Sequence, residues 1–359
     1  MKDTTTFPID PEGLTGLSQE RNQLNVGITY DLRDRYLALG YSEEETAEFD
    51  SLTTIDAIAG ALAELGYAPD LIGNAGELTQ RLIAGDRWDL VFNIAEGMLG
   101  LGREALIPAL LDSYRIPYTF SDPGVLALSL HKGFTKSILR DAGLHTANFM
   151  LIRNTADIDA VDLSYPLFAK PVAEGTGKGI DKTSKIDSPQ ELRLRCIELL
   201  ERYRQPVLVE EYLPGREFTV GIVGTGNRAE VLGIMEIIIK DRGEQGAYSY
   251  LNKEKCDEFV DYRFPKDEAA HQAAVLALKA WSVLDCRDAG RIDIRQDSHG
   301  LAAIIELNPL AGMHPGHSDL PMIATAAGMS YTELVGGIVT SARRRIPVST
   351  LAFARSCDG

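Results

Sequence analysis

The stretch GRIDIRQDSHGLAAIIELNPLAGM, residues 290–313, constrains the fold more than any other part of the sequence. Two runs of alternating apolar and polar residues flank DSHG (297–300), a pattern typical of a β-hairpin. Side chains alternate between the two faces of a strand, so a tight DSHG loop predicts an apolar face of Ile292, Ile294, Ile305 and Leu307. The opposite face would then carry Arg291, Asp293, Ile304, Glu306 and Asn308.

The polar face of this predicted hairpin brings together three side chains with oxygen donors and one guanidinium. Oxygen donors of the type of Asp293, Glu306 and Asn308 suit Mg²⁺, which is usually held by one or two carboxylates together with substrate phosphates. The alternative is an exposed sheet face with a surface ion pair, which contributes little to stability. The surrounding sequence has to decide between the two.

The order of the other predicted elements indicates an α/β segment followed by α+β segments. Strands are predicted at 25–30, 89–95 and 116–121, with helices at 53–67 and 103–115, which favours a parallel sheet with crossover helices. Further strands are predicted at 166–171, 206–213, 217–224 and 230–239, helices at 131–144, 188–203, 267–284 and 329–345, and a polar loop at 241–263.

Composition limits the possible partners. The formal net charge of −16 disfavours nucleic acid and anionic membrane surfaces. The four cysteines are scattered (Cys196, Cys256, Cys286 and Cys357), as expected of reduced thiols, and no apolar run reaches membrane-spanning length. With a polar start that does not resemble a signal peptide, this predicts a cytoplasmic protein without a membrane partner.

Two further stretches suit a nucleotide. PLFAKPVAEGTGKG ends a strand in Lys170 and continues into a loop with Gly175, Thr176 and Gly177, where backbone N–H groups can approach phosphate oxygens. VLVEEYLPGREF runs from a strand into Glu210–Leu213 and Glu217, which could contact an adenine edge and a ribose hydroxyl. Either stretch alone would be read as an ordinary turn.

Taken together and in this order, these stretches resemble the ATP-grasp superfamily, and most closely the D-alanine–D-alanine ligase family. The similarity runs from about residue 25 to 345 and includes IPYTFSDPGVLALSLHKGFTKSILRDAGL, FAKPVAEGTGKG, VEEYLPGREFTVGI, YSYLNKEK and GRIDIRQDSHG. It implies an α/β and α+β fold in which two domains enclose ATP, with an N-terminal parallel α/β domain at 1–128, a central subdomain at 129–218 and a C-terminal subdomain with the metal site at 219–359.

The resemblance also implies roles for individual residues. Lys132, Lys170, Gly175, Thr176, Gly177, Glu210, Glu211, Tyr212, Leu213 and Glu217 would bind ATP, and Lys253 would close over its γ-phosphate. Asp293, Glu306 and Asn308 would bind two Mg²⁺ ions, with Mn²⁺ as an alternative. Arg291 and the Gly312 backbone would stabilise the tetrahedral intermediate, Glu48 would receive the first amine, and Ser318 would hold the acceptor carboxylate.

The sequence departs from the dipeptide-forming members in its amino-acid half. Glu96 replaces a histidine, Glu254 replaces the tyrosine after Lys253, and Thr176-Gly177 replaces two serines. A long acidic insert, YDLRDRYLALGYSEEE, replaces a glycine-rich turn, and the acceptor loop is one residue longer. Glu96, placed in the substrate site, and Glu254 either meet a cationic acceptor such as a diamino acid or are solvated surface carboxylates.

The sequence therefore predicts an ATP- and Mg²⁺-dependent ligase that joins small amino acids through an acyl phosphate, an acid–amino-acid ligase of the EC 6.3.2 type with altered specificity. Two alternatives stay open at this point. One is a true peptidoglycan D-alanine–D-alanine ligase, and the other is an ATP-binding regulatory protein without catalysis. The resemblance further implies a homodimer.

Overall fold

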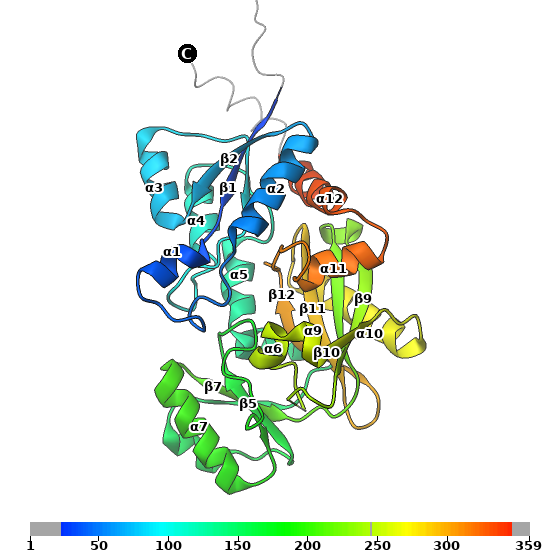
Figure 1. Ribbon diagram of the computed structural model, residues 1–359. Helices are drawn as coiled ribbons and strands as arrows, with labels where there is room; N and C mark the ends of the chain where they lie inside the picture. Colours follow the sequence, from blue (N-terminus) through cyan, green and yellow to red (C-terminus); the bar gives the residue numbers. More distant parts are fainter. Residues whose placement is uncertain (1–22, 245, 347–359) are drawn as a thin grey trace, which may run out of the picture.

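The computed structural model describes residues 23–244 and 246–346, and within them the strands form three sheets (Figure 1). One is a three-stranded parallel sheet in the order β2-β1-β3, and the other two are antiparallel, in the orders β4-β7-β5-β6 and β10-β9-β8-β11-β12. The predicted α/β and α+β architecture is therefore confirmed. The expectations for the start of the chain and for Cys357 lie outside the described residues.

The parallel sheet forms the core of the N-terminal part. Its elements are β1 (Asn25–Thr29), α1 (Arg33–Ala38), α2 (Leu52–Glu64), β2 (Ala68–Gly73), α3 (Ala75–Ala84), β3 (Leu90–Asn93) and α4 (Leu106–Ser113). Apolar β-branched residues favour the buried strand β1. A capping box between Asn74 and Glu77 starts α3, and Gly85, with φ of 101°, ends it.

The four-stranded sheet belongs to the central part of the chain. Two helices precede it, α5 (Pro123–Leu130) and α6 (Lys132–Asp141). Its own elements are β4 (Phe149–Ile152), the short 3₁₀ helix η1 (Thr155–Ala160), β5 (Leu167–Pro171), β6 (Lys185–Ile186), α7 (Pro189–Tyr203) and β7 (Val207–Glu211). Leu192, Cys196 and Leu199 pack the apolar stripe of α7 onto this sheet.

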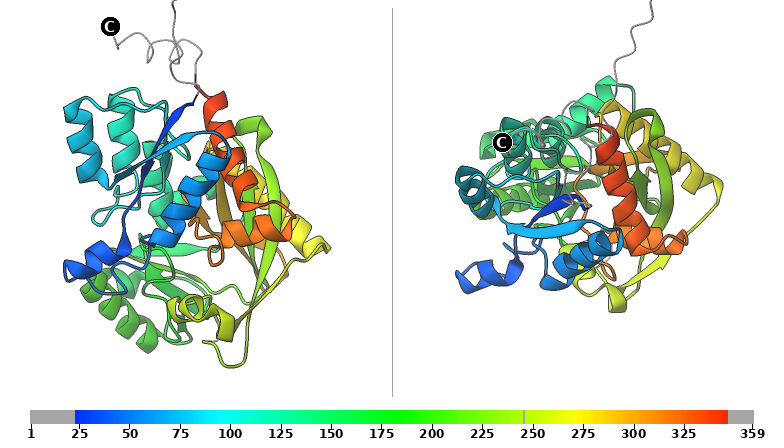
Figure 2. Two further views of the ribbon diagram at one scale, coloured as in Figure 1. Left: turned by 45° about the horizontal axis from the view of Figure 1, so that its top comes forward. Right: turned by 90° about the horizontal axis from the view of Figure 1, so that it is seen from above.

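The five-stranded sheet occupies most of the C-terminal part. Its elements are β8 (Glu217–Val223), η2 (Gly226–Arg228), β9 (Glu230–Ile239), α8 (Tyr250–Glu254), α9 (Cys256–Phe259), β10 (Val260–Arg263), α10 (Glu268–Val283), β11 (Ala289–Gln296), β12 (Ala302–Asn308), α11 (Asp319–Ala326) and α12 (Tyr331–Arg344). Helix α10 buries a row of alanines and Trp281 against the sheet. Helix α12 returns to lie beside α2, so the two ends of the described chain share one apolar core (Figures 1 and 2).

The predicted hairpin is confirmed, but part of its register was wrong. Asp293 pairs with Glu306 and Ile294 pairs with Ile304, so Ile305 is the extra residue of a β-bulge. As a result, Ile304 is fully buried on the apolar face, whereas Ile305 is half-buried and faces the polar side. The even alternation assumed from the sequence cannot reveal a bulge.

Two other predictions of secondary structure were wrong. The strand expected at 116–121 forms only a single parallel bridge, between Tyr118 and Val91, because Pro117 offers no amide donor and Phe120 turns the chain with φ of 70°. The region expected to be a polar loop, 241–263, contains α8, α9 and β10. The unpredicted elements include α1, β2, α3, α5, β4, β6 and α11, which have no counterpart among the predicted elements.

Two predictions from composition concern the cysteines and membrane-spanning segments. Cys196, Cys256 and Cys286 are free and buried. Within the described ranges, no single helix is long and apolar enough to cross a membrane; the bent pair α11 and α12 meets that test only when its two helices are counted together.

One buried carboxylate ties three parts of the fold together. Asp288 is fully buried and accepts hydrogen bonds from the Phe120 N–H (2.8 Å) and the Thr225 hydroxyl (3.1 Å). It also pairs with Arg345 at the end of α12. Asp288 therefore links the N-terminal part, the five-stranded sheet and the last helix.

We expect Asp288→Ala to lower the free energy of unfolding by roughly 3 kcal/mol, because it removes these bonds and leaves Arg345 without its partner. Asparagine tolerates the left-handed backbone at this position, so the free energy of unfolding of Asp288→Asn should lie between that of the wild type and that of the alanine variant. Denaturant unfolding measures both, with the exposed Asp162→Ala as control. A midpoint for Asp288→Ala equal to that of the control would contradict this role.

Candidate active site

A pocket lies between the four-stranded and the five-stranded sheets. Its lining comes from β5, β7 and the following loop, β8, the segment 247–253, and the hairpin β11–β12. Most of the residues that the sequence assigned to ATP line it, together with two of the assigned metal ligands: Lys170, Gly177, Glu210, Glu211, Tyr212, Leu213, Glu217, Lys253, Asp293 and Glu306. We refer to it as the nucleotide pocket.

The floor of the nucleotide pocket is a buried network of lysines and glutamates. Glu210 pairs with Lys136 (2.9 Å) and with Lys170 (2.8 Å), and all three side chains are buried. Although burial acts to raise it, the two ammonium charges lower the pKa of Glu210 to about 2. Lys132, at the start of α6, pairs with Glu306 at 2.8 Å. Lys136 was missed from the sequence, although it lies one helical turn after Lys132.

The outer end of the nucleotide pocket is aromatic and polar. The Tyr212 hydroxyl donates to the carbonyl of Gly246 (3.0 Å), and the guanidinium of Arg295 lies 5.1 Å from the Tyr212 ring. Arg295 also pairs with Glu217 at 3.3 Å. The Glu211 side chain is bonded to Asn148 (2.9 Å) outside the pocket floor. Arg295 was not predicted, although it follows Asp293 by two residues on the same strand.

The polar face of the hairpin meets this pocket. Arg291 lies opposite Asn308 and Asp293 lies opposite Glu306 in neighbouring cross-strand pairs. Arg291 forms an ion pair with Asp293, whose other oxygen accepts from the Thr219 hydroxyl at 2.9 Å. Thr219 was not predicted.

The donor set on this face fits Mg²⁺. In the described parts of the chain, no group of three or more His, Cys, Asp and Glu side chains forms a metal site. A metal at the hairpin would therefore have the two carboxylates of Asp293 and Glu306, the amide oxygen of Asn308, and further oxygens from phosphates or water. Mg²⁺ is usually bound in this way.

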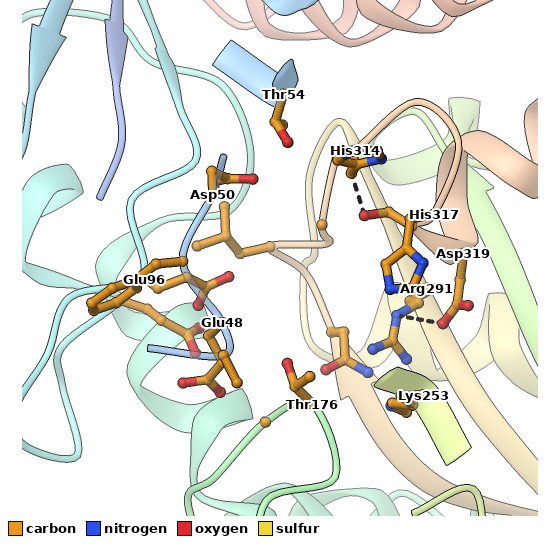
Figure 3. Close-up of a pocket in the computed structure, with 18 of the residues that line it drawn as sticks. Glu48, Asp50, Thr54, Glu96, Thr176, Lys253, Arg291, His314, His317 and Asp319 are labelled. Atoms are coloured by element: carbon orange, nitrogen blue, oxygen red, sulfur yellow. Dashed lines mark hydrogen bonds and ion pairs between the residues drawn. The ribbon is translucent and has the colours of Figure 1, made fainter. Parts of the chain in front are cut away.

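A second pocket, with a volume of about 380 Å³, lies between the N-terminal part and the end of the hairpin formed by the start of β11 and the end of β12 (Figure 3). Its volume is within the range of small-molecule sites. Its lining contains every residue that the sequence assigned to substrate or catalysis, and further assigned residues: Glu48, Glu96, Gly175, Thr176, Lys253, Arg291, Glu306, Asn308, Gly312 and Ser318. We refer to it as the substrate pocket.

The two pockets meet. Tyr248, Lys253 and Glu306 line both of them. Arg291 belongs to the substrate pocket and Asp293, two residues along β11, to the nucleotide pocket. A group held in one pocket can therefore react with a group held in the other.

Two glycines allow close approaches around this junction. A Cβ on Gly177, whose φ is +72°, would lie 2.8 Å from the amide nitrogen of Tyr250, so only glycine lets the loop 174–179 contact α8. A Cβ on Gly312 would lie 2.8 Å from the Ser318 hydroxyl, which accepts from the His314 N–H at 3.0 Å. Both contacts shape the substrate pocket.

Glu48, expected to receive an amine, already has two cationic partners. Its carboxylate pairs with Arg103 (3.0 Å) and Lys178 (2.9 Å). Burial acts to raise its pKa, but these two charges lower the pKa to about 2. Arg103 also donates to the Ala173 carbonyl at 2.9 Å. Neither Arg103 nor Lys178 was predicted, although Lys178 lies within the glycine-bearing loop.

Four other carboxylates of the substrate pocket have no such partners among the described residues: Asp50, Glu96, Glu104 and the exposed Glu254. In the described parts of the chain, no lysine or arginine forms an ion pair with Asp50, Glu96 or Glu104. Burial raises the pKa of Asp50 to about 7 and that of Glu104 to about 8, and burial together with the charge of Glu104 raises the pKa of Glu96. The sequence had singled out Glu96 but not Asp50 or Glu104.

Two antiparallel sheets enclose a pocket with buried lysines at its base, and one hairpin carries oxygen donors suited to Mg²⁺. This arrangement defines an ATP-grasp fold. Comparisons with known proteins give the family. Residues 138–340 match the family described as D-ala D-ala ligase C-terminus. The chain is 33% identical over 307 residues to a D-alanine–D-alanine ligase of Bordetella petrii, covering 84% of this chain and 90% of that protein.

Two further comparisons extend this result. The chain is 31% identical over 303 residues to an uncharacterized protein of Sinorhizobium fredii, covering 81% of this chain and 87% of that protein. The solved structure of the D-alanine–D-alanine ligase of Bacillus anthracis complexed with ATP matches the fold with a TM-score of 0.67 at 21% identity, over 89% of this chain and 98% of that one. The chain belongs to the D-alanine–D-alanine ligase family.

The unpartnered carboxylate of Glu104 gives a prediction on stability. Because its pKa is raised on folding, the folded state binds more protons than the unfolded state between about pH 4.5 and 8, and stability falls as the pH rises through this range. We expect Glu104→Gln to raise the melting temperature by a few degrees at pH 8, with the gain shrinking toward pH 5. Thermal unfolding of the wild type and the variant across this range measures the difference.

The exposed Glu258→Gln is the matched control, since it removes the same charge at the surface of α9. Its melting temperature should follow that of the wild type at each pH. A Glu104→Gln protein that is less stable than the wild type at pH 8 would show that the carboxylate is stabilised by the fold.

Proposed function

We propose that this protein is an ATP- and Mg²⁺-dependent ligase that forms an amide bond between two small amino acids, with a specificity altered from that of D-alanine–D-alanine ligases. The observation that carries the proposal is the junction of the nucleotide and substrate pockets at Lys253 and Glu306. A carboxylate can be phosphorylated only where it meets the γ-phosphate. Family membership and the ATP named for the Bacillus anthracis structure support the same reaction.

In this proposal the nucleotide pocket holds ATP. Glu210–Leu213 would contact adenine, Glu217 the ribose, and the glycines of the loop 174–179 the phosphates. Lys132 and Lys170 are pre-positioned by their ion pairs with Glu306 and Glu210. Their charges would offset the phosphate charges in a site with little water.

Asp293, Glu306 and Asn308 would hold the metal, as two Mg²⁺ ions or alternatively Mn²⁺. When bound, the metal would offset the charge that develops on the phosphates and polarise them toward attack. Thr219 would keep the Asp293 carboxylate oriented through its hydrogen bond of 2.9 Å.

The reaction would take place in two steps. A carboxylate oxygen of the first amino acid attacks the γ-phosphate, which gives an acyl phosphate and ADP. The amine of the second amino acid then attacks the acyl carbon, loses a proton, and phosphate leaves. Arg291 and the Gly312 N–H would stabilise the oxyanion of the tetrahedral intermediate, and Ser318 would bind the acceptor carboxylate.

The segment 241–263 would act as a lid. Lys253 lies on α8 within this segment, and the chain around Tyr250 contacts the glycine-bearing loop. A closed lid would keep water from the acyl phosphate. We also propose the division into domains at 1–128, 129–218 and 219–359, a homodimer and a cytoplasmic location.

Altered specificity is supported by the pocket's acidic side chains and by the sequence departures around them. The alternative, a true D-alanine–D-alanine ligase, is favoured by the names of the curated relatives. Phosphate release from ATP with Mg²⁺, measured with D- and L-amino acids singly and in pairs, separates the two. Turnover with D-alanine alone would support the alternative.

We expect Arg291→Ala to lose at least about a hundredfold in turnover while ATP affinity stays within a few-fold, because Arg291 lines the substrate pocket and not the nucleotide pocket. Single-turnover phosphate release and equilibrium binding of ATP measure the two quantities. If the wild type binds ATP but no amino acid or pair of amino acids causes it to release phosphate, the protein is instead an ATP-binding regulator.

We expect Glu306→Gln to lower turnover at least about tenfold, because it removes one metal-binding charge and frees Lys132 from its pair. The measurement is activity as a function of Mg²⁺ concentration, with a higher half-saturating concentration in the variant. Activity equal to that of the wild type at saturating Mg²⁺ would rule out Glu306 as a metal ligand.

A further inference from the structure

The charges around the substrate pocket are unevenly matched. Seven carboxylate side chains line it, against three from lysine and arginine. Of these cations, Arg33 pairs with Glu43 (2.6 Å) and Arg291 pairs with Asp293 and Asp319. Lys253 is the remaining one, at the junction with the nucleotide pocket.

Three of the four carboxylates that have no ion pair in the described part of the chain lie on one wall, and the fourth, Glu254, is on α8. Figure 3 shows Glu48, Asp50 and Glu96 on the side of the N-terminal part, facing Arg291, His314 and Asp319 across the pocket. Glu96 follows the carboxyl end of β3, Asp50 precedes α2, and Glu104 precedes α4. We call Asp50, Glu96 and Glu104 the acidic wall.

Besides the grouping of carboxylates on the acidic wall, the burial of Glu104 also indicates a ligand. Only 8% of its surface is exposed, and it lines the pocket. Across the described residues its carboxylate forms no hydrogen bond and no ion pair, and Arg103 and Lys132 act on it only through their charge. An isolated buried carboxylate is costly, so it is retained where a ligand's charge can compensate it.

A count of charges indicates the kind of ligand. Glu48 is already neutralised by Arg103 and Lys178, so the acidic wall is what an incoming substrate meets. The raised pKa values of its three carboxyl groups keep these groups partly protonated in the free protein, and each can release its proton to pair with an ammonium group. A simple amino acid brings one ammonium group and would leave two of the three carboxyl groups without a partner. A diamino acid brings two ammonium groups on one small molecule.

We propose that one of the two substrates is a diamino acid, whose second ammonium group binds between Glu96 and Glu104 on the acidic wall. This inference rests on the proposed ligase function and specifies its substrate. The carboxylate of that substrate would lie toward Lys253 and Arg291, across the pocket. Opposite charges at the two ends of the pocket would fix its orientation.

Matched substrate pairs test the proposal. Ornithine and norleucine have side chains of the same length and differ in a terminal ammonium or methyl group, as do 2,4-diaminobutyrate and norvaline. Each would be supplied with ATP and Mg²⁺ in both stereochemical forms, alone and with D-alanine as partner. We expect kcat/KM for at least one diamino acid to exceed kcat/KM for its neutral counterpart by about thirtyfold or more. The value of kcat/KM for the partner amino acid should not change in the same way.

Variants locate the effect. Glu96→Gln and Glu104→Gln should each lower the ratio of kcat/KM for the diamino acid to kcat/KM for its neutral counterpart at least about tenfold. Glu201→Gln, which removes an exposed charge on α7, should keep the ratio of the wild type. Thermal stabilisation by the diamino acid in the presence of ADP provides a readout independent of turnover, and it should be lost in Glu104→Gln.

The outcomes separate this inference from the proposed function. Turnover with neutral amino acids that equals or exceeds that with diamino acids would overturn the diamino-acid assignment and leave the ligase intact. A preference that survives in Glu96→Gln and Glu104→Gln would overturn the role of the acidic wall. Absence of phosphate release with all amino acids, together with no stabilisation by diamino acids, would overturn both proposals.

Discussion

The pairing of β11 with β12 is the constraint on which the site depends. Alternation along the two strands sends Ile292, Ile294, Ile304 and Leu307 into the core under α10, and this burial holds the hairpin in place. The same alternation forces Arg291, Asp293, Glu306 and Asn308 onto the opposite face, where neighbouring cross-strand positions are close enough to act on one ligand. The bulge at Ile305 adds an apolar side chain to the nucleotide pocket without changing the pairing of Asp293 with Glu306.

Charge is distributed around this hairpin in two different ways. In the nucleotide pocket, each buried lysine has a glutamate partner, as in the network of Lys136, Glu210 and Lys170, so the cations can be buried before ATP arrives. On the acidic wall of the substrate pocket, carboxylates have no such partners. In a chain with a net charge of −16, the nucleotide pocket therefore holds its lysines through glutamate partners, whereas the substrate pocket contains carboxylates without such partners.

The N-terminal part takes part in the site through contacts with the central loop. Glu48 binds Lys178, and Arg103 binds both Glu48 and the Ala173 carbonyl. A similar link joins Glu44 to the Tyr203 hydroxyl of α7 at 2.6 Å. These bonds hold the loop 174–179 between the N-terminal part and α8, so three separate segments of the chain enclose the junction of the two pockets.

The sequence by itself determined the elements whose signal is local. Alternation was sufficient to predict the hairpin and its polar face, helical spacing to predict α2, α7, α10 and α12, and the resemblance to select residues that line the two pockets. Tertiary structure decided the rest, because it depends on partners distant in the chain. The bulge at Ile305 and the ion pairs of Glu48 with Arg103 and Lys178 both follow from such contacts. So does the lack of a partner for Glu104: the sequence specifies a carboxylate, but only the packing around it determines whether its charge is compensated.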